Sequence, residues 1–228
     1  MSKGLGFYLL CVLGIAAFLV APYLVFFVAP QEATMGFIQK IFYFHVPCAW
    51  AAFLGALTCG VASATYLFTN GRRGESVAIA AAELAVVFGA LVLLTGPLWA
   101  RVAWGHYWVW DVRLTTTLML WLVFLAVLLA RRYAGPGAKR IAAGLALFGA
   151  ADVPLIYVSV RVWNTIHPKT TVVSTLGPKM RLAFFVSLFA FTMVFFVLLW
   201  LRLNLERSRG EVDSLVVDLE EIEAAGEG

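Results

Sequence analysis

The sequence predicts an all-α protein that crosses a membrane six times. Of its 228 residues, 62% are hydrophobic and only 13% are charged, whereas a soluble globular domain has about 45–50% apolar and about 25% charged residues. Six apolar stretches are each close to the length of about 20 residues that a helix needs to cross a bilayer. These features exclude a soluble enzyme, a disordered chain and a nucleic-acid-binding module, although the pI is about 9.1.

The predicted spans lie near residues 5–28, 46–69, 76–98, 115–130, 141–160 and 182–201. We expect helices because the stretches are too long and too uniformly apolar for the strands of a membrane barrel. The first stretch is too long for the apolar region of a secretory signal and has no A-x-A cleavage site, so we expect an uncleaved span.

The distribution of basic residues predicts that both termini are cytoplasmic. In that orientation ten of the 17 Lys and Arg residues lie on the inner side, which is the side that the positive-inside rule favours. The two inner turns, 70–75 and 131–140, are short and densely basic.

The chain is expected to divide into a six-span membrane domain, residues 1–202, and an acidic cytoplasmic tail, residues 203–228. The tail has two basic and eight acidic residues, a net charge of −6, and no strong helical or strand period. We therefore expect a largely disordered extension. The cysteines, Cys11, Cys48 and Cys59, have no metal-ligand spacing and are interpreted as small apolar residues.

Three long segments, 29–45, 99–114 and 161–181, connect the spans on the predicted outer side. They contain all three histidines, His45, His106 and His167, and seven basic residues. The basic residues are Lys40, Arg101, Arg113, Arg161, Lys169, Lys179 and Arg181. A translocated face ordinarily carries few cations, so these residues are expected to meet an anion. Ordinary anchoring to lipid headgroups is the alternative.

The middle outer segment contains an aromatic cluster that ends in an acid. Its members are Trp104, Gly105, Trp108, Trp110 and Asp111. On a helix, Trp104, Trp108 and Asp111 would fall within about 60° of one another. We therefore expect an interfacial helix that offers an aromatic platform to a planar conjugated ligand, with Arg101 and Arg113 at its margins.

An ordinary aromatic belt is the alternative interpretation, because Trp and Tyr concentrate at membrane interfaces in any case. A belt does not account for three Trp and a Tyr within seven residues, followed directly by an acid. Gly105 also lies within the cluster, where it would let a ligand approach the backbone closely. We therefore interpret the cluster as a platform.

Two histidines flank the aromatic segment in chain order. His45 precedes Pro47 at the start of the second span, and His167 follows the fifth span. Haem needs an axial nitrogen on each side of its iron, apolar contact for the macrocycle and cations for two propionates. Each requirement has a candidate in this sequence, and His45 and His167 are the candidates for the axial nitrogens. For either histidine alone, an ordinary hydrogen-bonding role is the alternative.

For the propionates the predicted order of preference is Arg113, then Arg101, then Arg161 and Arg181, because the first two adjoin the platform. His106 is interpreted as a polar neighbour. Zinc is less favoured, since this face has no cysteine and shows no third or fourth ligand at a metal-site spacing.

These residues resemble those of a known family. The pattern Trp104-Gly105-x-x-Trp108-x-Trp110-Asp111 is similar to the "WWD" signature of haem-handling proteins of cytochrome c assembly. The segments Phe44-His45-Val46-Pro47 and Ser159-Val160-x-x-Trp163-x-Thr165-x-His167 resemble the flanking histidine segments of the haem exporter protein C family of the System I maturation pathway. The resemblance covers nearly all of residues 1–202. Val162 and Pro168 depart from the family pattern, in the third outer loop.

The resemblance implies that haem b is held at the periplasmic face of a bacterial inner membrane, with His45 and His167 as ligands and the WWD residues as platform. It also implies three partners besides membrane lipid: a periplasmic haem chaperone that receives the haem, a small single-span accessory protein, and an ABC-type transporter complex. A haem-binding and transfer protein is expected rather than an enzyme, with no catalytic residue and no nucleic-acid partner.

Two other functions stay open at this point. A cytochrome c haem lyase of a related WWD branch would ordinarily be larger and carry more histidines. A haem or solute permease would need a polar path through the spans, where the sequence offers only Asp152, Glu83 and scattered Ser and Thr. A membrane-embedded acid is costly, so we expect Asp152 to be protonated and hydrogen-bonded between helices, or to be a polar step on a haem path.

Overall fold

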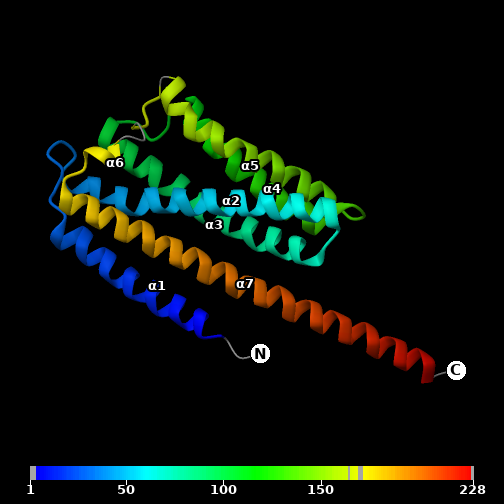
Figure 1. Ribbon diagram of the computed structural model, residues 1–228. Helices are drawn as coiled ribbons and strands as arrows, with labels where there is room; N and C mark the ends of the chain where they lie inside the picture. The colour runs from blue at the N-terminus through cyan, green and yellow to red at the C-terminus, as the bar shows by residue number, and fades with distance from the viewer. Residues whose placement is uncertain (1–3, 164, 169–171, 227–228) are drawn as a thin grey trace.

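The protein is a bundle of long helices, seen in a computed structural model that describes residues 4–163, 165–168 and 172–226 (Figure 1). Its elements are α1 (Leu5–Tyr23), η1 (Leu24–Val28), η2 (Phe37–Ile41), α2 (Phe42–Thr69), α3 (Arg72–Trp104), α4 (Val112–Tyr133), α5 (Ala138–Val162), α6 (Val172–Thr175) and α7 (Pro178–Gly226). Six helices are long and apolar enough to span a membrane, and the described residues form no strand. The predicted all-α, six-span fold is confirmed.

The helices extend beyond the predicted spans at the end of the bundle that carries the long connections. A 3-10 turn, η2, leads directly into α2, and α3 continues to Trp104. Hydropathy marks only the part of a helix within hydrocarbon, so polar and aromatic helix ends cannot be distinguished from loops by hydropathy alone. We call this end of the bundle, which carries residues 29–41, 105–111, 165–168 and 172–177, the loop end. Both chain termini point away from it (Figure 1).

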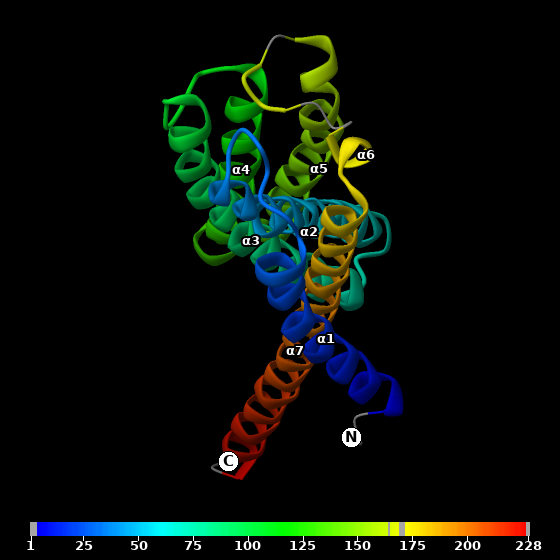
Figure 2. The same ribbon diagram turned by 90° about the vertical axis from the view of Figure 1, so that its left-hand side faces the viewer.

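Helix α2 is the central helix, with α3, α5 and α7 packed around it (Figure 2). Its approach to α3 is close because Gly55 has no side chain: a Cβ there would lie 2.9 Å from the backbone nitrogen of Ala85. Cys48 and Cys59 are free and buried on α2, where they act as small packing residues, as predicted. Small residues let helix backbones approach, and van der Waals packing is a principal force between helices in a bilayer.

The first span is fixed to the bundle by a buried lysine. The Lys40 ammonium donates to the carbonyl oxygens of Val25 at 2.7 Å, Ala29 at 2.5 Å and Pro30 at 3.2 Å. Val25 lies in the last turn of this helical segment, and Ala29 and Pro30 follow its end directly, where carbonyl groups have no partner within the helix and the helix dipole is negative. Lys40 was expected to meet an anion on the outer face, and in the structure its ammonium is hydrogen-bonded instead to backbone carbonyl oxygens. Lys169, another of these cations, lies outside the described residues.

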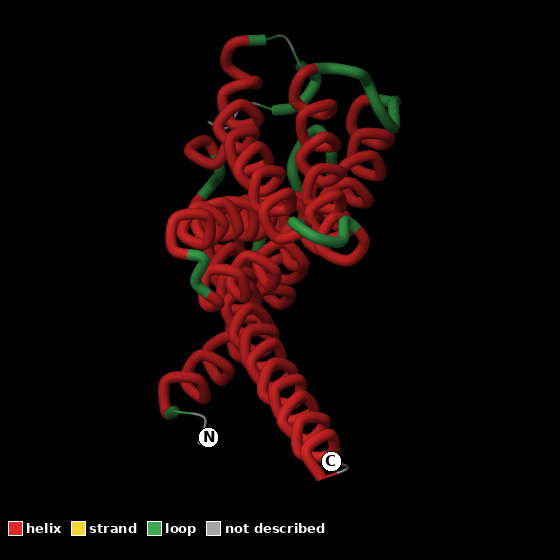
Figure 3. Tube along the Cα trace, turned by 90° about the vertical axis from the view of Figure 1, so that its right-hand side faces the viewer, coloured by secondary structure: helices red, strands yellow, loops and turns green. Residues whose placement is uncertain are grey.

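Helix α1 packs against α7 at the side of the bundle (Figure 3). Phe7 of α1 stacks on Trp200 of α7, with ring centroids 3.8 Å apart. Helix α7 then continues well past the other helices to Gly226. This differs from the disordered tail that we expected. The Leu, Val, Glu and Ala of this segment are compatible with a helix, and Arg202 pairs with Glu206 one turn later at 2.5 Å. The division into two domains stays a prediction.

Candidate functional site

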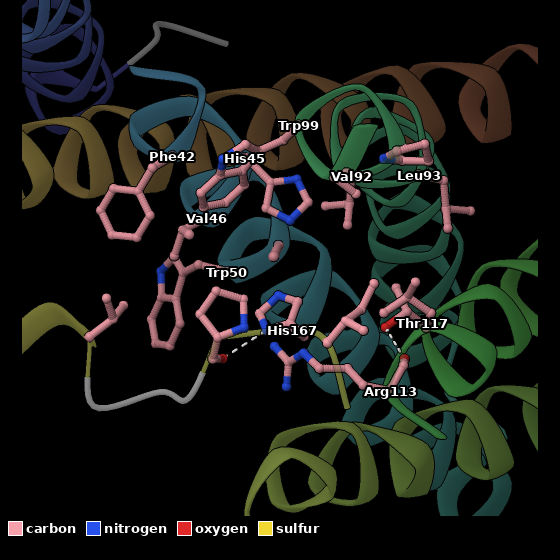
Figure 4. A pocket seen from close by; sticks show the side chains of 18 of the residues that line it. Phe42, His45, Val46, Trp50, Val92, Leu93, Trp99, Arg113, Thr117 and His167 are labelled. Atoms are coloured by element: carbon pink, nitrogen blue, oxygen red, sulfur yellow. Dashed lines mark hydrogen bonds between the residues drawn. The ribbon is translucent and has the colours of Figure 1, made fainter. Parts of the chain in front are cut away.

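A cavity of about 710 Å³ opens within the loop end, between α2, α3, α4 and the segment around α6. This volume lies within the range of about 300–1,000 Å³ that is usual for small-molecule sites. Five of the residues predicted to contact haem line the cavity: His45, Trp104, Trp108, Arg113 and His167. Figure 4 shows its interior, in which the imidazole rings of His45 and His167 face one another.

His45 is held near the start of α2 with one ring nitrogen already paired. Its Nδ1 lies 2.8 Å from the hydroxyl oxygen of Thr95 on α3. The Thr95 hydroxyl itself donates to the carbonyl oxygen of Leu91 at 2.7 Å, so its oxygen accepts from His45 Nδ1–H. We infer from this pattern that the lone pair of His45 is on Nε2, the nitrogen that is free to bind a metal.

His167 has the same tautomer for a different reason. Its Nδ1 lies 2.9 Å from the carbonyl oxygen of Pro168, and a carbonyl can only accept, so Nδ1 carries the proton. Burial, and then the positive charge of Arg113, lower the pKa of His167 to about 3. The ring is therefore neutral near pH 7. Two imidazoles on opposite sides of a cavity, whose Nε2 atoms have no hydrogen-bond partner among the described residues, are suited to axial ligation of a haem iron.

Arg113 brings a positive charge to the same cavity. It lies in the first turn of α4, and one guanidinium N–H donates to the carbonyl oxygen of Ile156 on α5 at 2.8 Å. Figure 4 shows the guanidinium beside His167. A guanidinium has five N–H donors arranged for a carboxylate, so Arg113 is suited to a propionate.

The other cations that we predicted for this role lie elsewhere. Arg101 is exposed and donates to the carbonyl oxygen of Gly105 at 2.5 Å, with its guanidinium over the ring of Tyr107. The guanidinium of Arg161 lies over the ring of Tyr157. Neither arginine, nor Arg181, is among the described residues that line the cavity.

The aromatic segment is a loop, and the expected interfacial helix is wrong. Helix α3 ends at Trp104 because Gly105 adopts a left-handed conformation, with φ of +82°. Helix α4 begins only at Val112, where the Asp111 carboxylate caps it by accepting from the backbone N–H of Leu114 at 2.8 Å. Trp104, Trp108 and Asp111 consequently do not share a helix face.

The residues of this loop have separate positions. Trp104 and Trp108 line the cavity, whereas Gly105, Trp110 and Asp111 are not among the described lining residues. Trp110 is 75% exposed, with its ring centroid 5.6 Å from that of Trp108. His106 is exposed as well.

Asp111 lies behind the cavity and connects the aromatic loop to the loop of His167. One carboxylate oxygen accepts a short hydrogen bond from the Thr165 hydroxyl and a second, of 3.2 Å, from the backbone N–H of Ile166. The Thr165 hydroxyl oxygen in turn accepts from the backbone N–H of His167 at 3.1 Å. Asp111 therefore holds the backbone from which the His167 imidazole projects.

Sequence reasoning missed Thr95 and Trp99. Thr95 lies 50 residues from its partner His45, and the Trp99 ring lies 5.8 Å from the His45 ring, nearly edge-on. Nothing in their local sequence indicates these contacts, since a threonine and a tryptophan are common in membrane helices. Only the packing of α3 on α2 brings them to His45.

The fold and the cavity define a polytopic helical membrane protein with a paired-histidine site. A family model described as "Heme exporter protein C" matches residues 3–218. The chain therefore belongs to the heme exporter protein C family, and its role is in haem handling for cytochrome c maturation. This confirms the family resemblance found in the sequence.

Similar proteins occur in bacteria and in plants. The chain is 37% identical over 186 residues to "Heme exporter protein C" of Bradyrhizobium diazoefficiens, which covers 81% of this chain and 70% of the relative. It is 32% identical over 202 residues to the protein of the same name from Escherichia coli K12, covering 83% and 80%. A "Putative cytochrome c biosynthesis ccmC-like mitochondrial protein" of Marchantia polymorpha is 31% identical over 185 residues, covering 78% and 79%.

Proposed function

We propose that the protein binds haem b in this cavity, with His45 and His167 as axial ligands, and presents it at the periplasmic face of the inner membrane to a haem chaperone. The observation that supports this most directly is the pair of imidazoles on opposite walls of one cavity. Each ring has its Nδ1 committed to a hydrogen bond, which leaves Nε2 for iron. In this proposal haem is the cargo of the protein.

The residues in and around the cavity have different roles in holding haem. Trp104 and Trp108 supply apolar surface for the macrocycle, and Arg113 receives a propionate. Asp111 holds the loop of His167 in place. Bound haem supplies the reactive vinyl groups and iron, and the protein's part is to orient them and shield them from the bilayer.

Partners follow from the same proposal. The chaperone accepts haem at the loop end, while a small single-span accessory protein and an ABC-type complex act with the membrane domain. Co-purification distinguishes this function from that of a haem lyase. We expect a tagged periplasmic haem chaperone to be recovered with the parent protein when haem is supplied, and apocytochrome c not to be. Recovery of apocytochrome c alone would favour the lyase instead.

Absorption spectra of purified protein test the ligands. We expect a Soret band in the parent protein that is lost in both His45→Gly and His167→Gly, because each leaves one side of the iron without its ligand. Added imidazole should restore the band, since it can occupy the vacated position. His106→Gly is the matched control, because His106 is exposed and outside the cavity lining. Unchanged spectra in both ligand variants would refute the assignment.

The position of the arginines gives a second expectation. Arg113→Met should weaken haem retention by about 10- to 100-fold, since a hydrogen bond to a charged group contributes about 1.5–3 kcal/mol. Arg101→Met should cause a clearly smaller loss, because Arg101 is not among the described residues that line the cavity. Haem transfer to an excess of a soluble haem scavenger, followed by absorbance, measures both. Equal losses in the two variants would contradict a specific role for Arg113.

A further inference from the structure

We propose that Thr95 is a positioning residue for haem binding, which fixes the tautomer and ring orientation of His45 through a hydrogen bond to Nδ1. The inference rests on the proposed function, because it concerns how one of the two proposed ligands is prepared for iron. Thr95 lies on α3 and is not itself a ligand.

The direction of the hydrogen-bond chain follows from the chemistry of its members. A hydroxyl has one hydrogen, and that of Thr95 is directed at the Leu91 carbonyl oxygen, four residues earlier on the same helix, at 2.7 Å. If the hydroxyl hydrogen turned toward His45 instead, the bond to Leu91 would be lost, because the Leu91 carbonyl has no hydrogen to donate in return. The Thr95 oxygen therefore accepts the Nδ1–H of His45 at 2.8 Å.

The packing around the His45 imidazole restricts its orientation in addition to this hydrogen bond. The imidazole is buried, with 7% of the residue exposed, and it lies against the backbone of α3 at Gly96. A Cβ added at Gly96 would stand 3.3 Å from His45 Cε1. Trp99 covers a further side, with its ring at 70° to the imidazole. Packing thus confines the ring, and the Thr95 hydroxyl determines which nitrogen carries the proton.

This bond has a direct consequence for the metal-binding nitrogen. A hydrogen bond donated by the second ring nitrogen of a ligating histidine fixes its tautomer and raises the basicity of the ligating nitrogen. Without the acceptor, the neutral ring can carry its proton on Nε2, and that tautomer has no lone pair for iron at this position. Loss of such a partner commonly weakens metal binding by about 10- to 100-fold.

The two histidines differ in a way that makes the inference testable. His167 donates to a backbone carbonyl, which no substitution removes. His45 donates to a side chain, and Val has nearly the shape of Thr without its hydroxyl. Thr116 provides a matched control: it is a buried threonine on α4 that donates to the carbonyl four residues earlier, at 2.6 Å, and it does not line the cavity.

The experiment compares Thr95→Val, Thr95→Ser and Thr116→Val in the full-length protein. We expect Thr95→Val to lose haem to a scavenger about 10- to 100-fold more readily than the parent, and its midpoint potential to rise because a less basic imidazole stabilises ferric iron less. Thr95→Ser keeps a hydroxyl and should restore both values. Thr116→Val should match the parent, since it loses the same intrahelical bond but no contact to His45.

A double variant separates positioning from a general loss of packing. In the His45→Gly background, reconstituted with added 1-methylimidazole, Thr95→Val should add no further loss, because this substitute ligand has no N–H to donate to Thr95. The inference is overturned if Thr95→Val equals the parent, or if it weakens haem binding equally with and without His45. The proposed function fails separately, if His45→Gly itself leaves the parent spectrum unchanged.

Discussion

Asp111→Ala should remove haem from the protein as completely as His167→Gly, although Asp111 lies behind the cavity and not in its lining. The carboxylate accepts from the backbone N–H groups of Leu114 and Ile166 and from the Thr165 hydroxyl. Hydrogen bonds to a charged group contribute about 1.5–3 kcal/mol each. Losing even one of the bonds to the His167 loop corresponds to about a tenfold or larger fall in the fraction of molecules in which His167 is held in place.

A graded series makes the expectation specific. Thr165→Val removes the Thr165 bond to Asp111 and the acceptor of the His167 backbone N–H, but it keeps the Asp111 bonds to Ile166 and Leu114. It should therefore cause a smaller loss of the Soret band than Asp111→Ala. Imidazole should restore the band in Asp111→Ala, because the defect is a misplaced axial ligand. If imidazole restores His167→Gly but not Asp111→Ala, then Asp111 acts on folding and not through His167.

The spans and the candidate ligands could be predicted from the sequence, whereas the role of Asp111 could not. Long apolar stretches report burial in hydrocarbon directly, so the six spans were predictable to within one or two helical turns at most ends. His45 and His167 could be proposed as axial ligands from the sequence because few other residues supply an axial nitrogen, and this role stays a prediction. In the sequence Asp111 was one member of an aromatic cluster, and its contact with Thr165, 54 residues away, depends on how α4 and α5 pair.

The aromatic segment shows why a periodicity argument failed there. Trp104, Trp108 and Asp111 do have helical spacing, but Gly105 ends one helix and Asp111 begins the next. Two local capping signals outweighed the spacing of the large side chains. The same limit applies to the cations: composition identified several, but only the position of Arg113 at the start of α4 placed one of them at the cavity.

The membrane acids were also distinguished only by tertiary structure. Acids are costly in a bilayer, so Asp152 was expected to be hydrogen-bonded between helices or to lie on a haem path, and the same cost applies to Glu83. Glu83 on α3 is paired: its carboxylate accepts from Nη2 of Arg202 on α7 at 2.7 Å and, by a shorter bond, from Nε of the same side chain. One carboxylate oxygen of Asp152 is buried without a hydrogen-bond partner among the described residues. The proposed protonation of Asp152 stays a prediction.

Arg202→Met should therefore destabilise the protein strongly, and more than Glu83→Gln. Removing one partner of a fully buried ion pair costs about 3–5 kcal/mol because the other charge is left uncompensated. The Glu83 side chain is 34% exposed, so the lower end of that range is expected. Glu83→Gln should cost less, since Arg202 keeps a second carboxylate partner in Glu206, at 2.5 Å.

The double variant Glu83→Gln/Arg202→Met decides whether the uncompensated charge is the cause. It should be more stable than Arg202→Met alone, because no unpaired charge then remains on α3 in the membrane. Unfolding of the purified protein by increasing denaturing detergent, followed by circular dichroism, measures all three, with Arg207→Met as an exposed control on α7. If the double variant is as unstable as Arg202→Met, the arginine stabilises α7 by packing and not by neutralising Glu83, and the two helices are held together by their apolar surfaces alone.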